Sequence, residues 1–111
     1  MQEQVNIKLS EFARENTGRF FSANVTKRQI MVKPIVVASW GAHDWFEFKD
    51  VGLIFKVQGL LHKGYVMVTL RWDDLYAVHL FDKEGNQVGE SVNGVYCDML
   101  TDVIDGLVET P

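Results

Sequence analysis

The sequence predicts an α+β fold: a short N-terminal helix, an antiparallel meander sheet of five or six strands, and a C-terminal amphipathic helix packed on one face of the sheet. Short β-rich runs separated by turn residues fill the middle of the chain. Near residue 95 the apolar residues change from alternation to helical spacing. No linker or internal repeat interrupts the 111 residues, so we expect a single globular domain over residues 1–111.

The N-terminal helix is predicted from its end signals. Ser10 can cap a helix over residues 11–16, because a serine hydroxyl accepts a hydrogen bond from the free amides of a first turn. Gly18 can adopt the left-handed conformation that ends a helix. We therefore expect about two turns of helix at this point.

Two strands are expected to follow this helix. Residues 19–26 and 30–39 are rich in aromatic and β-branched side chains, and a polar turn at Lys27–Arg28 would separate them. Because Pro34 lacks an amide hydrogen, the second strand should be broken, bulged or at an edge. An irregular corner over residues 40–44 then leads into the sheet.

The middle of the chain predicts the clearest strands. These β-rich runs are Trp45–Phe48, Leu53–Gln58, Tyr65–Trp72 and Leu75–Phe81. In the third run one of the two alternating sets is fully apolar, which is typical of a half-buried antiparallel strand. A tight hairpin at Asp73–Asp74 should join the third run to the fourth.

The C-terminal segment predicts a last short strand and a helix. The strand is expected at Gln87–Val92, and apolar residues recur at helical spacing from Val95 onward. Asn93 is a candidate N-cap, although Asn93–Gly94 is also a common turn pair. Cys97 falls on the apolar side of this helix, so we expect a buried and inert thiol there.

Charge is distributed unevenly along the chain. The formal net charge is -4, made up of +3 over residues 1–33, +1 over residues 34–72 and -8 over residues 73–111. An acidic chain of this kind is not a general binder of nucleic acid. The longest apolar runs, such as Ile35–Ala38, are far shorter than the roughly 20 residues that cross a membrane, so no membrane interaction is expected. A lone cysteine fits a reducing compartment, and we expect a cytoplasmic protein.

Four acidic residues of the last helix are the first candidate binding site. They recur at intervals of four, three and four residues, which places them on one helix face: Asp98, Asp102, Asp105 and Glu109. Residues 84–111 contain no lysine or arginine. Such a row can be a solvated face, screened by the N-terminal bases, or a surface for a basic or nucleic-acid-binding protein partner.

Two further clusters are candidate binding sites. Trp40, His43 and Trp45 form a tryptophan-rich corner, which is either a partner-binding spot or a corner whose tryptophans belong to the core. The N-terminal bases Lys27, Arg28 and Lys33 offer an alternative, in which a basic hairpin binds single-stranded nucleic acid. That alternative is disfavoured because the rest of the surface would repel phosphate.

No recognised catalytic motif occurs in the sequence. The three histidines, His43, His62 and His79, are widely separated, so no metal-ligand spacing exists and neither a metal nor a cofactor is expected. We predict no catalytic residues and no enzymatic activity. An enzyme would require an unrecognised site in which the fold brings a histidine or paired carboxylates together.

Two segments resemble parts of small uncharacterised proteins of bacteriophages and other bacterial mobile elements. They are residues 9–21, LSEFARENTGRFF, and residues 95–105, VYCDMLTDVID. The resemblance implies a small accessory protein that acts on host or phage machinery. Together with the acidic helix face and the tryptophan-rich corner, it favours a non-enzymatic interaction protein with a macromolecular partner. A second copy of the chain, paired through a sheet edge, is an alternative partner.

Overall fold

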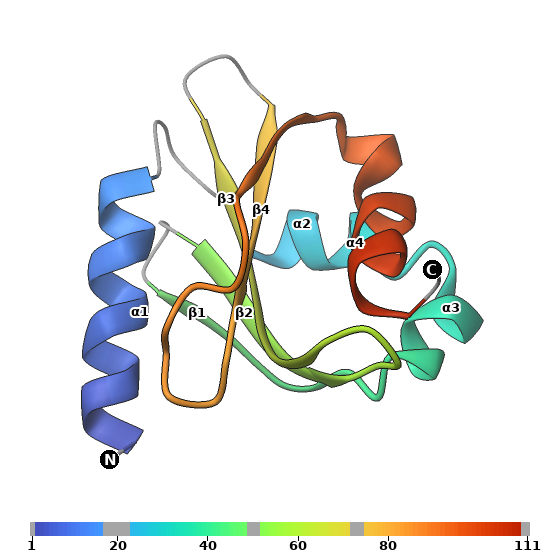
Figure 1. Ribbon diagram of the computed structural model, residues 1–111. Helices are drawn as coiled ribbons and strands as arrows, with labels where there is room; N and C mark the ends of the chain where they lie inside the picture. Colours follow the sequence, from blue (N-terminus) through green and yellow to red (C-terminus); the bar gives the residue numbers. More distant parts are fainter. Residues whose placement is uncertain (1, 17–22, 49–51, 72–74, 110–111) are drawn as a thin grey trace.

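The computed structural model describes residues 2–16, 23–48, 52–71 and 75–109, which form a sheet between two layers of helices (Figure 1). The elements are α1 (Gln2–Asn16), α2 (Ala23–Ile30), α3 (Pro34–Ser39), β1 (His43–Phe48), β2 (Gly52–Gln58), β3 (Lys63–Leu70), β4 (Tyr76–Phe81), β5 (Val92–Val95), the 3₁₀ helix η1 (Cys97–Met99) and α4 (Leu100–Val108). Within the described ranges the five strands lie in sequence order, each antiparallel to the next. The predicted α+β meander is confirmed.

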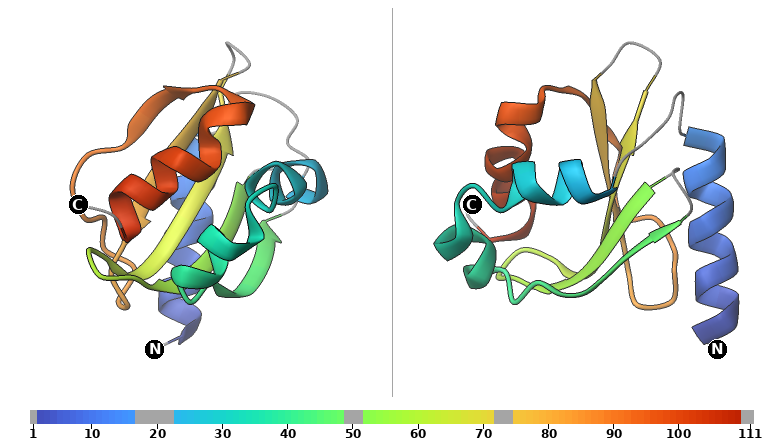
Figure 2. Two further views of the ribbon diagram at one scale, coloured as in Figure 1. Left: turned by 90° about the vertical axis from the view of Figure 1, so that its right-hand side faces the viewer. Right: turned by 180° about the vertical axis from the view of Figure 1, so that it is seen from behind.

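The helices cover both faces of the sheet. Helix α1 lies against one face, whereas α2, α3 and α4 lie on the opposite side (Figures 1 and 2). None of the described helices is both long and apolar enough to cross a membrane. The sheet therefore lies between two apolar layers, to which β2 and β3 both contribute residues.

Each apolar layer follows from the alternation of side chains along the strands. Odd-numbered residues of β2 face α2, α3 and α4, where the core includes Ile30, Val37, Trp40, Phe55, Val66, Val68, Leu100, Ile104 and Val108. The other layer joins three residues of α1, Val5, Leu9 and Ala13, to strand residues Ile54, Tyr65, Met67 and Phe81. The expectation that Tyr65–Trp72 is half-buried is wrong, because β3 is buried on both faces from Gly64 to Thr69.

Helix α1 is longer than predicted and begins before Ser10. Val5, Leu9 and Ala13 recur every four residues, so they form one apolar stripe that packs on the sheet. Ser10 is not a cap, since its hydroxyl donates back to the Ile7 carbonyl from within the helix at 3.5 Å. The cap prediction failed because the polar residues between the stripe positions conceal the helical period. Gly18 lies outside the described residues.

The two strands predicted before the sheet are wrong where the structure describes them. Residues 23–30 form α2 and residues 34–39 form α3, while residues 19–22 lie outside the described part of the chain. Pro34 occupies the first turn of α3, a position where the missing amide hydrogen breaks no helical bond. Strand propensity is a weak preference, and helical packing of Ile30 and Val37 against the sheet overrides it.

The C-terminal segment also departs from the prediction. The last strand lies at Val92–Val95, and Gln87 makes only an isolated bridge to Phe81. Asn93 is therefore a strand residue and not a helix cap. The α-helix begins at Leu100, after η1, and this shift leaves the Cys97 thiol exposed instead of buried.

The turn between β2 and β3 packs tightly on the end of α4. A Cβ atom at Gly59 would lie 2.2 Å from the carbonyl oxygen of Val108, so only glycine fits this contact. The same carbonyl accepts the amide hydrogen of Leu61 at 2.8 Å. The predicted two-residue turn at Asp73–Asp74 lies outside the described residues, but β3 and β4 pair antiparallel up to Leu70 and Tyr76.

Substitution of Leu9 tests the packing of α1. Leu9 is 0% exposed, and Leu9→Ala should lower the free energy of unfolding by about 2–5 kcal/mol through lost burial and a residual cavity. Ile7 is 55% exposed on the same helix, so Ile7→Ala should change it by no more than about 0.5 kcal/mol. Urea denaturation of both variants measures the difference. Equal effects would show that α1 does not cover this face in solution.

Candidate functional site

The four acidic residues lie at the C-terminal end of the chain, but not on one continuous helix. Asp98 belongs to η1, Asp102 and Asp105 belong to α4, and Glu109 is the residue that follows α4. Asp98 and Asp102 are exposed, whereas Asp105 and Glu109 are partly buried. The structure therefore divides the predicted row into an exposed pair and a pair that faces neighbouring elements.

The partly buried pair attaches α4 to the rest of the fold. Asp105 accepts a hydrogen bond from the indole Nε1 of Trp40 at 2.9 Å, and Trp40 is completely buried. Glu109 accepts one from the backbone amide of Leu60 at 2.9 Å. A buried indole N–H needs such a partner, so Asp105 stabilises the fold, and Glu109 attaches the end of α4 to the exposed turn between β2 and β3.

Of the exposed pair, only Asp102 has a partner within the described residues. Its Oδ1 lies 2.7 Å from Nζ of Lys33, so an N-terminal base does screen part of the acidic row. Both side chains are more than half exposed, and the pair contributes at most about 1 kcal/mol. Asp98 makes no hydrogen bond or ion pair with any residue that the structure describes.

The tryptophan-rich corner is mainly a core structure. The Trp45 ring is half-buried and stacks on Phe55, with 4.1 Å between ring centroids. Because Trp40 is fully buried, its ring offers no contact area to a partner. His43 is partly exposed, and its Nδ1 donates to the Gly41 carbonyl at 2.7 Å.

The N-terminal bases lie on or after a helix and not at a hairpin tip. Lys27 and Arg28 belong to α2, and Lys33 precedes α3. The Lys27 ammonium lies 4.9 Å from the Trp45 ring centroid, a cation–π distance. Since Lys33 pairs with Asp102, both Lys27 and Lys33 already have intramolecular partners.

A chain of polar side chains that the sequence did not suggest lies around His79 on the α1 face of the sheet. Its Nε2 lies 2.9 Å from Oγ1 of Thr69, and its Nδ1 lies 2.6 Å from Oγ of Ser91. Gln87 donates its side-chain amide to the same Ser91 hydroxyl at 3.0 Å. The Phe12 ring of α1 packs edge-on against the imidazole at 4.8 Å. A serine, a histidine and a third polar group are therefore hydrogen-bonded in the same order as the nucleophile, base and orienting group of a catalytic triad.

The properties of His79 favour a structural role for this chain. Burial, aided by the positive charge of Arg71, lowers the pKa of His79 from 6.5 to about 4. The imidazole is then neutral at pH 7 and a weak general base, since a base works best with a pKa near the working pH. Thr69 also lacks the negative charge that would stabilise an imidazolium. The chain therefore satisfies the polar atoms of a buried histidine.

The other side chains with chemical potential are dispersed. His62 is buried, with Nε2 3.2 Å from the Tyr65 carbonyl oxygen. Among the described residues, no group of three or more His, Cys, Asp or Glu side chains is placed to hold a metal ion.

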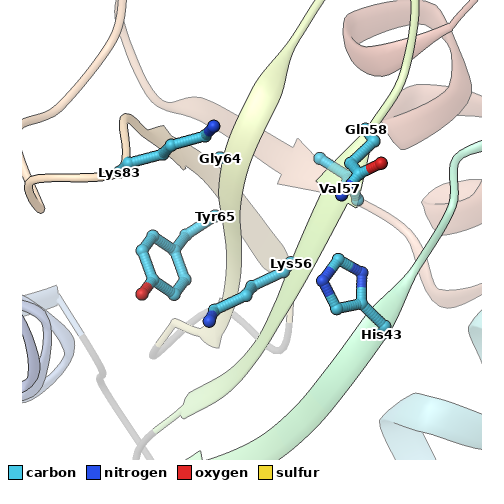
Figure 3. Close-up of a pocket in the computed structure, with 7 residues that line it drawn as sticks. All are labelled: His43, Lys56, Val57, Gln58, Gly64, Tyr65 and Lys83. Atoms are coloured by element: carbon cyan, nitrogen blue, oxygen red, sulfur yellow. The ribbon is translucent and has the colours of Figure 1, made fainter. Parts of the chain in front are cut away.

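A pocket that the sequence analysis missed opens on the α1 side of the sheet. We call it the lysine pocket; its volume is about 340 Å³, and it is lined by His43, Lys56, Val57, Gln58, Gly64, Tyr65 and Lys83 (Figure 3). The one sequence signal was the pair of polar residues, Lys56 and Gln58, that ends the otherwise apolar β2. Lys83 is distant in sequence, so no local pattern connects it to that pair.

Comparison with known proteins does not assign a family to these sites. No protein-family model matches the chain, and no curated protein or solved structure is significantly similar to it. Inferences about function therefore depend on the contacts, exposure and charge described above.

Substitution of Asp105 tests the structural role of the partly buried carboxylates. Asp105→Ala leaves the buried Trp40 indole without its acceptor, which should lower the free energy of unfolding by about 1–3 kcal/mol. Asp105→Asn retains an acceptor oxygen and should recover much of this loss. Asp98→Ala removes an exposed charge that has no partner among the described residues, and it should change stability by about 0.5 kcal/mol or less. Chemical denaturation would contradict this role if Asp98→Ala and Asp105→Ala were equally stable.

The His79 environment predicts a dependence of stability on pH. The unfolded chain binds a proton at His79 below pH 6.5, whereas the folded protein does so only near pH 4. Stability contributed by neutral His79 is therefore complete above pH 6.5 and is lost as the pH falls toward 4, by up to about 3 kcal/mol. In urea denaturation at several pH values, His79→Asn should show a flatter decline than the unsubstituted protein. Parallel declines would show that His79 titrates normally in the fold.

Proposed function

We propose that this protein is a non-enzymatic interaction protein that binds a protein partner through the surface around α4. The three most exposed large apolar side chains among the described residues are Ile35, Leu60 and Val32, at 85%, 79% and 68%. We define the α4 surface as these three residues together with Asp98 and Asp102. Single exposed apolar residues are ordinary, but several on one side of a molecule are typical of an interface.

The positions of the three apolar residues carry the proposal, because all three flank α4. Val32 and Ile35 bracket Lys33, which pairs with Asp102 of α4. Leu60 lies in the β2–β3 turn, whose amide binds Glu109 at the other end of the helix. In Figure 2 (left), α3, α4 and this turn all lie on the side of the sheet that faces the viewer. A partner that contacts α4 would therefore cover apolar side chains on both sides of it.

The charge of the α4 surface indicates the chemistry of the partner. Asp98 has no described counter-ion, and the Asp102–Lys33 pair is exposed enough for a partner's cation to replace it. No lysine or arginine follows Lys83 in the chain. The expected partner therefore presents lysine or arginine beside apolar side chains, as many nucleic-acid-binding proteins do. The tryptophan-rich corner contributes little in this proposal, since Trp40 is buried.

Other properties support a non-catalytic accessory role inside a cell. The only Ser–His pair described above contains a weakly basic imidazole. The Cys97 thiol is free and exposed, which fits a reducing compartment such as the cytoplasm. The resemblance to phage and mobile-element proteins makes a host or phage protein the expected partner.

Paired surface variants test this function. The protein and its variants are immobilised, a lysate of the source cells is applied, and each retained protein is purified and titrated against every variant by calorimetry. Ile35→Ser/Leu60→Ser and Asp98→Lys/Asp102→Lys should each weaken binding at least about 10-fold, because interface anchors and complementary charges are lost. The affinity of the unsubstituted complex should also fall as the salt concentration rises.

Matched substitutions on α1 are the controls. Ile7→Ser and Glu11→Lys/Glu15→Lys change the same residue types on exposed positions of the opposite helical layer, and they should leave affinity within about 2-fold. The α4 surface would be rejected as the binding site if both sets of substitutions weakened binding equally, or if the α4 substitutions left the affinity unchanged. Light scattering of the free protein identifies the remaining case, in which a second copy of the chain occupies the surface.

A further inference from the structure

We propose that the lysine pocket binds the phosphate group of a small phosphorylated molecule. The pocket lies on the opposite face of the sheet from the α4 surface, so this inference is independent of the protein partner. Its residues come from three neighbouring strands and one turn: His43 from β1, Lys56 and Gln58 from β2, Tyr65 from β3, and Lys83 from the turn after β4. A volume of about 340 Å³ lies within the usual range for small-molecule sites.

The register of the sheet explains why these residues line one pocket. Lys56 pairs with His43 on one side and with Tyr65 on the other, so the three residues form a row across β1, β2 and β3. Tyr65 pairs in turn with Phe81 of β4, two residues before Lys83. Directly paired residues point to the same face of a sheet. Figure 3 shows the row, with Lys56 and Lys83 on either side of Tyr65.

The charge of the pocket favours an anion. Among the described residues, two lysines line it and no aspartate or glutamate does, although the chain as a whole carries a formal charge of -4. Asp44 reaches Lys56 from outside the lining at 3.4 Å, which leaves the remaining ammonium hydrogens available. Lys83 makes no ion pair or hydrogen bond with the described residues. Two such cations suit the doubly charged phosphate of a monoester better than a single carboxylate.

The nearest acidic residue in sequence, Asp82, is already satisfied by its own turn. Its Oδ1 accepts the backbone amide hydrogens of Asn86 at 2.9 Å and Glu84 at 3.0 Å. These hydrogen bonds, that of Asn86 foremost, hold the pKa of Asp82 below its usual value. The carboxylate thus organises the turn that carries Lys83 and does not neutralise it.

Several contacts hold the pocket in shape before a ligand arrives. The Lys56 ammonium lies 5.6 Å from the ring centroid of Tyr65, which is itself 3% exposed. Gly64 has a φ of 150°, and a Cβ atom there would lie 2.2 Å from the Phe81 carbonyl oxygen, so only glycine fits at this edge of the pocket. A preformed site loses less conformational entropy when it binds.

The uncharged groups indicate what the phosphate is attached to. His43 donates through Nδ1 to the Gly41 carbonyl, which leaves Nε2 to form a hydrogen bond with a ligand. The Gln58 amide is exposed and can both donate and accept. A ring nitrogen beside a side-chain amide suits hydroxyl groups, which can both donate and accept hydrogen bonds. We therefore infer a sugar phosphate or a nucleotide, in which a phosphate and hydroxyls occur on one small molecule.

The test is a titration with probes that separate these chemical features. Ribose 5-phosphate, inorganic phosphate and ribose are added to the ¹⁵N-labelled protein at constant ionic strength, and amide shifts are followed by NMR. Ribose 5-phosphate should bind saturably with a Kd below ~10 mM, shift amides of residues 56–58, 64, 65 and 83, and bind more tightly than inorganic phosphate. Ribose alone should produce no saturable shift.

Lysine variants identify the binding residues, with an exposed neighbour as the control. Lys56→Met and Lys83→Met keep most of the side-chain length and should each weaken ribose 5-phosphate binding at least about 10-fold. Lys63 begins β3 opposite Gln58 but does not line the pocket, so Lys63→Met should change the Kd by about 2-fold or less. Circular dichroism melting curves confirm that each variant is folded.

Three results would overturn the proposal. The first is no saturable shift with either phosphate-containing probe. The second is equal weakening by Lys63→Met and Lys56→Met, which would indicate attraction to general surface charge. The third is saturation only by a single-stranded oligonucleotide added as a fourth probe, which would indicate a nucleic-acid surface instead of a small-molecule pocket.

Discussion

The structure depends on a sheet that is apolar on both faces and must therefore be covered from both sides. Strand β3 shows the constraint most clearly, since its residues from Gly64 to Thr69 are buried irrespective of the face to which they point. Burial of apolar surface is the main favourable term in folding, and a sheet of this kind leaves half of it exposed unless a second layer forms. Helix α1 supplies that layer through Val5, Leu9 and Ala13.

The same constraint gives the acidic residues of the C-terminal segment two different tasks. Helix α4 closes the second apolar layer, and its position is held by polar contacts from Asp105 to Trp40 and from Glu109 to Leu60. Carboxylates in these contacts are part of the fold. Only acidic groups that point away from the layer, such as Asp98, remain available to a partner, so a functional assay must treat the two sets separately.

Incomplete cover on the α1 face accounts for the lysine pocket. The α1 stripe packs on Ile54, Tyr65 and Met67, and the next residues of β2 on that face are Lys56 and Gln58, which are less buried. Polar side chains at this end avoid an exposed apolar edge and leave a hollow between the strands and the turn at Lys83. The two proposed binding surfaces are thus consequences of where each helical layer ends.

Local patterns in the sequence determined the meander, because alternation in runs such as Leu53–Gln58 and the turn residues between runs act over only a few positions. For the same reason, the sequence alone reveals the regular spacing of Asp98, Asp102, Asp105 and Glu109. Tertiary structure decided that Pro34–Ser39 is a helix, since burial of Val37 against the sheet outweighs its strand propensity. It also decided which carboxylates are structural and that Lys56 and Lys83 line one pocket. Those outcomes depend on contacts between residues far apart in the chain, which local periodicity does not encode.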